Sequence, residues 1–174
     1  LPDFGEIIRH INSRPTHCRQ LVPGAPGYIG YCDACRTGAG GVWISGKNHL
    51  PPAVWRVEWP KDIQNSLVTR ENKDGIVTVN DLEMAGVLLH TAVLETAIGR
   101  AMVGAQFAIG CDNSPAVAWT TRMATRSETP ISFRLLRGLA MRQHQTRSAP
   151  PAVFHVAGVQ NTLADVASRP PSDV

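Results

Sequence analysis

The stretch Gly27-Tyr-Ile-Gly-Tyr-Cys-Asp33 is a short apolar run that ends in an acidic residue, and the glycine-rich segment Thr37-Gly-Ala-Gly-Gly41 soon follows it. An apolar run of this length predicts a strand, the glycines predict a turn, and Val42 to Ser45 is expected to return beside the first strand as a hairpin. Residues 54–59 partly alternate and predict a third strand, which Pro60 ends. The sequence therefore predicts a sheet that begins with three antiparallel strands.

Helices and strands alternate along the rest of the chain. Apolar residues at helical spacing predict a long, largely buried helix from Asn80 to Ile98, after a polar and irregular segment over residues 61–79. Residues 105–111 and 152–156 predict two more strands; residues 114–123 and 130–147 predict helices, and Asn161 is expected to cap a last one. The fold class is thus α/β, with a five-stranded mixed sheet flanked by helices, because helical crossovers make the last two strands parallel to the first.

The composition is that of a globular domain with a mildly basic balance. The 174 residues are 43% hydrophobic and 18% charged, with a formal net charge of +3. Residues 1–27 are expected to be an N-terminal linker with one amphipathic stretch from Phe4 to Ile11, residues 28–169 one domain and residues 170–174 a tail. Fourteen of the seventeen basic residues are arginine, which weakly favours a nucleic-acid partner.

The sequence also gives expectations about cellular context. The chain does not begin with Met, so we interpret it as a piece of a longer product. No apolar stretch is expected to reach the roughly 18 residues needed to span a bilayer, so no membrane partner is predicted. Four cysteines without the spacing of a secreted framework indicate a reducing, intracellular location, in the cytoplasm or nucleus.

Four acidic residues stand in recognisable local settings. Asp33 and Asp112 each end an apolar run, Glu83 lies at the start of the long helix, and Asp165 lies at the start of the last helix. Sites in open α/β sheets form at the carboxyl ends of the parallel strands, where Asp33 and Asp112 are expected to face each other. A cluster of four carboxylates would need cations, and hard divalent ions prefer oxygen ligands. Two such ions would suit in-line phosphoryl transfer.

With these four acids in their settings, the chain resembles the ribonuclease H domain of retroelement reverse transcriptases, of the long-terminal-repeat or DIRS-like kind. The resemblance rests on four pieces in order: Tyr31-Cys-Asp33-Ala with Gly38-Ala-Gly-Gly-Val42, Asn80-Asp-Leu-Glu83, Cys111-Asp112-Asn113-Ser114, and His155 to Arg169 with Asn161-Thr-Leu-Ala-Asp165 inside it. Each piece alone is a weak signal. Their shared order and spacing across residues 28–169 make a strong one.

The resemblance implies an endonuclease that cuts the RNA strand of RNA/DNA hybrids with two Mg²⁺ or Mn²⁺ ions. It implies that Asp33, Glu83, Asp112 and Asp165 are the catalytic metal ligands. It also implies that Asn80 contacts the minor groove of the hybrid. Four further polar residues around the site are expected to contact the nucleic acid, namely Asn113, Ser114, His155 and Asn161. The implied partners are the hybrid and an upstream reverse transcriptase domain of the same polyprotein.

Two departures from the family pattern concern the grip on the substrate. Many members carry a histidine in the loop before the last helix, whereas Ala157-Gly-Val-Gln160 has none and His155 precedes it. Some relatives also have a basic helical protrusion, for which the short link Ala124-Thr-Arg-Ser-Glu-Thr129 leaves no room. Weak hybrid binding by the isolated domain would follow.

Each functional interpretation of a residue has a purely structural alternative. Glu83 could be the third residue of a capping box with Asn80 as N-cap, and the three aspartates could be turn or first-turn acids. Cys32-Asp-Ala-Cys35 resembles half of a zinc site, yet buried packing of Cys32 near Cys111, on the face away from Asp33 and Asp112, is favoured. Three tryptophans could stack on bases but are more typical of packing: Trp43, Trp55 and Trp59. The arginines of residues 122–147 could contact phosphate or be a solvated face.

Two other function classes stay open. A catalytically inactive module of the same fold could bind nucleic acid or act as a scaffold for the polymerase, but the complete set of four acids argues against it. A DNA-directed nuclease or strand-transferase of the same superfamily often differs in its second or last acid, and the Asn80-to-Glu83 helix start fits ribonuclease H better.

Overall fold

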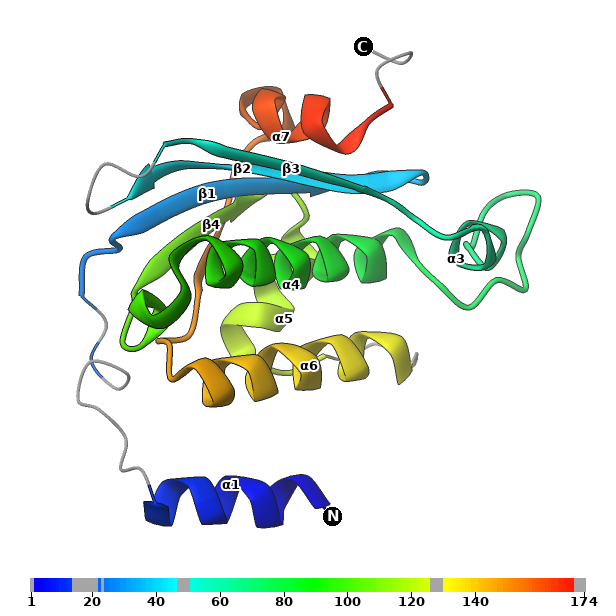
Figure 1. Ribbon diagram of the computed structural model, residues 1–174. Helices are drawn as coiled ribbons and strands as arrows, with labels where there is room; N and C mark the ends of the chain where they lie inside the picture. The colour runs from blue at the N-terminus through cyan, green and yellow to red at the C-terminus, as the bar shows by residue number, and fades with distance from the viewer. Residues whose placement is uncertain (1, 14–21, 23, 47–50, 126–129, 171–174) are drawn as a thin grey trace.

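The computed structural model describes residues 2–13, 22, 24–46, 51–125 and 130–170. A five-stranded mixed sheet forms the centre of the molecule (Figure 1). Its strands are β1 (Tyr28–Ala34), β2 (Gly38–Gly46), β3 (Ala53–Glu58), β4 (Phe107–Cys111) and β5 (Ala152–His155), in the spatial order β3-β2-β1-β4-β5. The first three strands are antiparallel, and β4 and β5 run parallel to β1. The predicted fold class and strand directions are confirmed.

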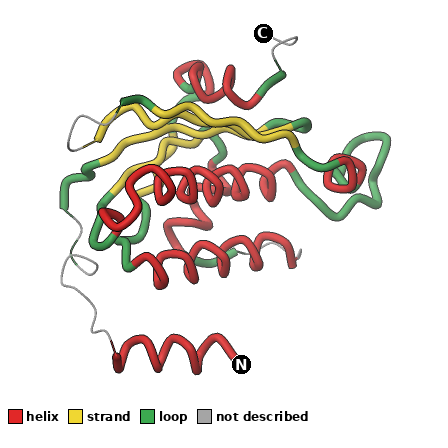
Figure 2. The backbone as a smooth tube through the Cα atoms, in the orientation of Figure 1, coloured by secondary structure: helices red, strands yellow, loops and turns green. Residues whose placement is uncertain are grey.

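Helices cover both faces of the sheet (Figure 2). On one face lie α4 (Val79–Ile98), α5 (Ser114–Arg122) and α6 (Pro130–Thr146), and on the other lies α7 (Thr162–Ser168). Four smaller or peripheral helices complete the described chain: α1 (Pro2–Ser13), α3 (Lys61–Asn65), and the 3-10 turns η1 (Gly99–Met102) and η2 (Gly158–Gln160).

Helix α4 is the centre of the core, because it packs against the sheet on one side and against α6 on the other. Val87 and Leu94 meet Phe107 and Ile109 of β4, whereas Met84 meets Leu139 of α6. Residues 79–102, which comprise α4 and η1, are long and apolar enough to cross a bilayer, contrary to the expectation that no stretch would be. A helix buried within a core meets the same criterion, and 44% of the window is buried inside the fold.

The glycine-rich segment predicted as a turn belongs to β2, which begins at Gly38. The turn is instead the short link 35–37, closed by a 2.8 Å hydrogen bond from the Cys35 amide to the Gly38 carbonyl. The glycines serve close packing rather than chain reversal. A Cβ on Gly40 would lie 2.3 Å from the backbone of Ala167, so the absence of a side chain lets α7 lie directly on the sheet.

Two helix caps and one segment also differ from the sequence predictions. Helix α4 is capped by Thr78, which forms a reciprocal capping box with Asp81, so Asn80 is not the N-cap and the capping-box interpretation of Glu83 is wrong. Asn161 precedes α7 but makes no side-chain cap. The segment expected to be irregular contains α3, followed by an isolated bridge between Leu67 and Val77.

The amphipathic stretch near the N-terminus is helical over its whole length as α1. Phe4, Ile8 and Ile11 lie at helical spacing, and each is more than half exposed. The packing of this helix therefore contributes little to the core that positions the acidic residues.

Candidate metal site at the end of the sheet

Asp33 and Asp112 lie beside each other because β1 and β4 are parallel neighbours. The register pairs Tyr31 with Gly110, and each aspartate follows its partner in that pair by two residues. Asp33 is buried, at 7% exposure, and Asp112 is half-buried. The prediction that the first and fourth strands bring these two carboxylates together is consistent with this register.

Glu83 enters the same region from the first turns of α4. Its side chain is buried, at 5% exposure, and its Oε2 lies 3.9 Å from the Cys111 thiol. The side-chain ligand atoms of Glu83, Cys111 and Asp112 lie within 4.8 Å of one another, a spacing that could hold a metal ion. The prediction that Cys111 lies on the face away from the acids is wrong, because its thiol lies beside the Glu83 carboxylate.

Asp165 comes from the first turn of α7, on the opposite face of the sheet from α4. Close packing of α7 on β2, permitted at Gly40, brings it over the end of β1. The charges of both Asp112 and Asp165 act on Asp33. Asp33 and Asp165 nevertheless lie outside the tight group made by Glu83, Cys111 and Asp112, among the residues the structure describes.

Two neighbours at the end of α7 hold the outer acids in place. Ser168 donates a 2.5 Å hydrogen bond to Asp33 Oδ2. Arg169 donates to Asp165 Oδ1 from both Nε, at 2.9 Å, and Nη2, at 2.6 Å. Sequence reasoning assigned no role to either residue, although their i+3 and i+4 spacing from Asp165 on a helix was a usable signal.

Burial and mutual repulsion disfavour the ionised carboxylates when no cation is present. Burial raises the pKa of Glu83 to about 10, helped by the charges of Cys111, Asp33 and Asp112 and opposed by a hydrogen bond with the Ala34 backbone. Burial likewise raises the pKa of Asp33, the Ser168 hydrogen bond opposes this effect, and Asp112 and Asp165 add to it. A divalent cation would reverse both shifts, because it favours the charged forms.

The donor set fits hard divalent cations. Carboxylate oxygens from four separate elements converge at one edge of the sheet, and oxygen ligands of this kind suit Mg²⁺ and Mn²⁺. Cys111 would add a soft ligand only if it lost its proton. The candidate ligands are therefore the four acids predicted from the sequence.

Of the predicted nucleic-acid contacts, Asn80 and Asn113 form a pair. Asn113 Nδ2 donates to Asn80 Oδ1 at 3.0 Å, and Asn113 Oδ1 caps α5 by accepting from the Ala116 amide at 2.9 Å. The pair joins the starts of α4 and α5 beside Glu83 and Asp112. Ser114, the first residue of α5, is exposed next to it.

His155 and Asn161 differ in accessibility. His155 is exposed at the end of β5, and its Nε2 lies 3.2 Å from the Asp112 carbonyl oxygen. Asn161 is only 2% exposed, and its side chain donates to the Cys32 carbonyl oxygen at 3.0 Å. Asn161 thus fastens the start of α7 to β1, and its burial argues against direct contact with a nucleic acid.

Packing decides whether the tryptophans and cysteines named in the sequence analysis are structural or functional residues. All three tryptophan indoles donate hydrogen bonds inside the fold: Trp43 to the His90 carbonyl, Trp55 to His90 Nδ1 and Trp59 to the Cys35 carbonyl. Cys32 is buried against Cys111, as favoured, whereas Cys35 contacts Thr37 and the Ser168 carbonyl. No second pair of zinc ligands joins Cys32 and Cys35 in the described part of the chain.

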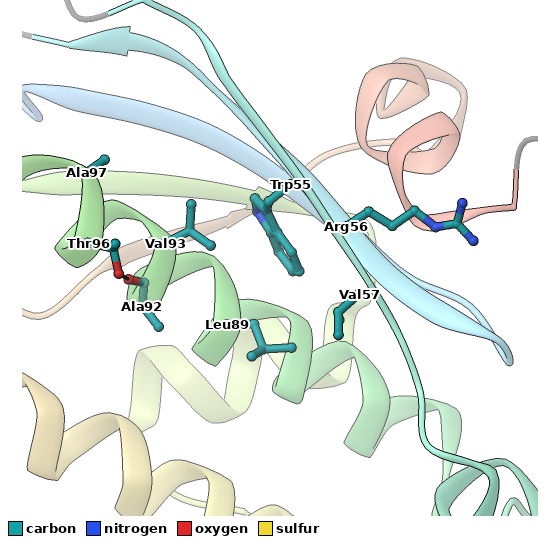
Figure 3. A pocket seen from close by; sticks show the side chains of 8 residues that line it. All are labelled: Trp55, Arg56, Val57, Leu89, Ala92, Val93, Thr96 and Ala97. Atoms are coloured by element: carbon teal, nitrogen blue, oxygen red, sulfur yellow. Dashed lines mark hydrogen bonds between the residues drawn. The ribbon is translucent and has the colours of Figure 1, made fainter.

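A shallow apolar groove lies elsewhere, between β3 and the second half of α4 (Figure 3). Trp55, Val57, Leu89 and Val93 line it, and the Arg56 side chain points away from it. No acidic residue lines it, and the Thr96 hydroxyl donates to the Ala92 carbonyl oxygen, so the groove does not compete with the acidic cluster as a catalytic site.

Comparisons with known proteins identify the fold. No protein-family model matches the chain, and no curated protein matches it in sequence. A ribonuclease H1 isolated from compost by a metagenomic approach matches with a TM-score of 0.57 and 15% identity, over 80% of this chain and 91% of that one. The same protein in complex with an RNA/DNA hybrid matches with a TM-score of 0.57 and 14% identity, over 80% and 92%.

Ribonuclease H1 from the halophilic archaeon Halobacterium salinarum NRC-1 matches with a TM-score of 0.51 and 17% identity, over 80% of this chain and 92% of that one. The chain therefore has the ribonuclease H-like fold. At such low identities the likeness establishes the fold and leaves the activity to be argued from the site.

Proposed function

We propose that this protein is a metal-dependent endonuclease that hydrolyses the RNA strand of RNA/DNA hybrids. The observation that carries the proposal is the convergence of Asp33, Glu83 and Asp112 at the end of β1 and β4, with Asp165 brought in by α7. Four acids from distant parts of the sequence have no structural need to meet in one place, since their mutual repulsion costs free energy.

The four carboxylates are the proposed ligands of two Mg²⁺ or Mn²⁺ ions. Bound there, such ions would activate a water and stabilise the charge that builds on the transferring phosphate. The chain's own contribution is preorganisation. Glu83 is fixed by the Ala34 backbone, Asp33 by Ser168, and both strands are held in register by the sheet.

Discrimination between RNA and DNA would come from groups beside the acids. The Asn80 and Asn113 amides form a polar platform at the starts of α4 and α5, at hydrogen-bonding range of each other. Short polar side chains of this kind suit a sugar 2′-hydroxyl, which can both donate and accept. His155 and Ser114 are exposed nearby and are proposed to contact the backbone of the hybrid.

We place this activity within a retroelement reverse transcriptase polyprotein that acts inside the cell, with an upstream polymerase domain as partner. This context rests on the sequence motifs rather than on the fold. An upstream domain would also supply contacts to the hybrid in place of the basic helical protrusion for which the link after α5 is expected to leave no room. The link's residues 126–129 lie outside the described part of the chain.

The competing function is an inactive module of the same fold that binds nucleic acid or supports the polymerase. The observation that favours it is that Ser168 and Arg169 already contact Asp33 and Asp165. Cleavage of a labelled RNA/DNA hybrid with Mg²⁺, Mn²⁺ or chelator separates the two functions. Metal-dependent cutting of the RNA strand supports the nuclease, whereas binding of the hybrid without cutting supports the inactive module.

A further inference from the structure

The last turn of α7 places one arginine directly on a candidate metal ligand. Arg169 Nε and Nη2 both donate to the same oxygen, Oδ1 of Asp165, at 2.9 and 2.6 Å. The positive charge of Arg169 also lowers the pKa of the nearby Asp33 carboxyl. The arginine therefore supplies positive charge to the two outer acids of the cluster.

The guanidinium and a metal ion compete for one carboxylate, because Arg169 engages Oδ1 and its charge lies beside Oδ2. A carboxylate oxygen that accepts two N–H groups has little capacity left for a cation, and a dication beside a guanidinium is repelled by it. Ser168 differs, because its hydroxyl is neutral and contacts only Oδ2 of Asp33 among the carboxylate oxygens. Ser168 can keep its contact when a cation binds, whereas the Arg169 charge repels a cation at Asp165 and favours departure of the guanidinium.

We propose that Arg169 is a positioning residue that acts as a stand-in cation: it holds Asp165 in the metal-free protein and releases it when a divalent ion binds. This inference rests on the proposed function, because it takes Asp165 as a metal ligand. The salt bridge is about half exposed at both partners, so the guanidinium can swing into solvent without disturbing the core.

The arrangement has two consequences. Arg169 reduces repulsion among the acids before the metal arrives, and it lowers the apparent metal affinity by the fraction of molecules in which Asp165 is engaged. Removal of the guanidinium should therefore tighten divalent metal binding. From the size of exposed ion pairs, the expected decrease in Kd is about 1.5- to fivefold.

The test compares Mn²⁺ and Mg²⁺ binding by calorimetry in the wild type, Arg169→Gln and Arg100→Gln. Arg100→Gln removes one charge from η1, the exposed turn that follows α4, and the helix from Glu83 to Ile98 is about 22 Å long, so this variant controls for net charge. We expect a lower Kd in Arg169→Gln and an unchanged Kd in Arg100→Gln. An equal effect of the two substitutions, or none, would overturn the inference.

A second readout follows the guanidinium itself during a metal titration of the wild type. The ¹H–¹⁵N signal of Arg169 Nε, assigned by its loss in Arg169→Lys, should shift as Mg²⁺ is added, with the same midpoint as backbone signals around Asp33 and Asp112. Metal binding that leaves this signal unchanged would overturn the inference and leave the proposed function intact. Absence of any metal binding would overturn both.

Discussion

The Ser168 hydroxyl lies 2.5 Å from Asp33 Oδ2, which ties the last turn of α7 to the end of β1. The tie spans 135 residues of sequence and crosses from a helix to the central strand of the sheet. The same turn carries Arg169 on Asp165. The position of α7 on the sheet therefore decides whether the fourth acid reaches the other three.

Gly40→Ala should displace α7 and damage the site from a distance. The new Cβ would lie 2.3 Å from the Ala167 backbone, so the helix must shift. Overpacking of this kind costs about 1–3 kcal/mol of stability. Chemical denaturation measures the loss, and divalent metal affinity should fall with it.

Gly86→Ala is the matched control. Gly86 lies within α4, where an added Cβ would meet the Ala34 Cβ and the Asp33 carbonyl oxygen, each at an ordinary 3.8 Å. Alanine should leave stability unchanged or raise it by about 0.5–1 kcal/mol, because it is the better helix former. Equal destabilisation by the two substitutions would mean that close packing of α7 is not what Gly40 provides.

Glu83→Gln should stabilise the metal-free protein at alkaline pH. Because the pKa of Glu83 is about 10 in the fold and 4.5 as its ordinary value, the unfolded chain ionises first as pH rises. The contribution of Glu83 to the free energy of unfolding is therefore fully present below pH 4.5 and is lost progressively up to about pH 10. With chelator at pH 8, the variant should gain about 1–3 kcal/mol over the wild type.

The metal should reverse this difference. Mg²⁺ should raise the melting temperature of the wild type and release protons on binding, since the ligands must ionise. Glu83→Gln should show a smaller rise. A wild type whose stability in chelator does not fall between pH 5 and 9 relative to Glu83→Gln would contradict the burial argument.

His90 should govern stability at acidic pH. It is fully buried, stacks on Trp43 with ring centroids 4.0 Å apart, and accepts from Trp55 Nε1 on Nδ1 at 2.7 Å. Burial lowers the pKa of His90 to about 3, from 6.5. The contribution of neutral His90 to the free energy of unfolding is present above pH 6.5 and is lost as pH falls toward 3. At pH 4 the loss is about 2–3 kcal/mol.

Thermal melts of the wild type and His90→Gln isolate this effect. The variant is expected to be less stable at pH 7, since it loses the stacking, but its stability should change less between pH 7 and pH 4. Asp33 and Glu83 are present in both proteins and cancel in the comparison. Parallel pH profiles would show that His90 is not the group that titrates.

Much of the fold could be predicted from the sequence, because strand and helix patterns are local. The apolar runs ending in Asp33 and Asp112 gave β1 and β4, and the long apolar periodicity gave α4. The turn predicted at the glycines of β2 was wrong, because glycine favours turns when it is considered alone, whereas here it allows close contact with α7. The N-cap at Thr78 was missed because Asn80 offers a competing local signal.

The candidate site was only partly predictable. The four acids have local signatures at strand and helix ends, which is why they could be named in advance. The contact of Arg169 with Asp165 is local, four residues apart, and its spacing was a usable signal. Ser168 reaches Asp33, and Cys111 reaches Glu83, only because α7 and α4 approach the strand ends from opposite faces. Similarly, the burial of Asn161 against Cys32 is invisible to a pattern of helix caps.

Asp112→Asn should abolish cleavage while it keeps the fold. The side chain is half-buried beside Glu83, and the amide removes a charge from a repulsive cluster, so stability should hold or rise. Loss of one ligand should lower the cleavage rate at least about 100-fold. Circular dichroism and melting in chelator verify the fold, and full activity in this variant would refute the metal-ligand assignment.

The most direct measurement is strand-specific cleavage of an end-labelled RNA/DNA hybrid by the wild type and Asp112→Asn, with single-stranded RNA and duplex DNA alongside. We predict Mg²⁺- or Mn²⁺-dependent cutting of the hybrid's RNA strand only, abolished by chelator and by the substitution. Intact hybrid at saturating protein and metal, with wild-type binding to that hybrid retained, would contradict the assignment of a nuclease.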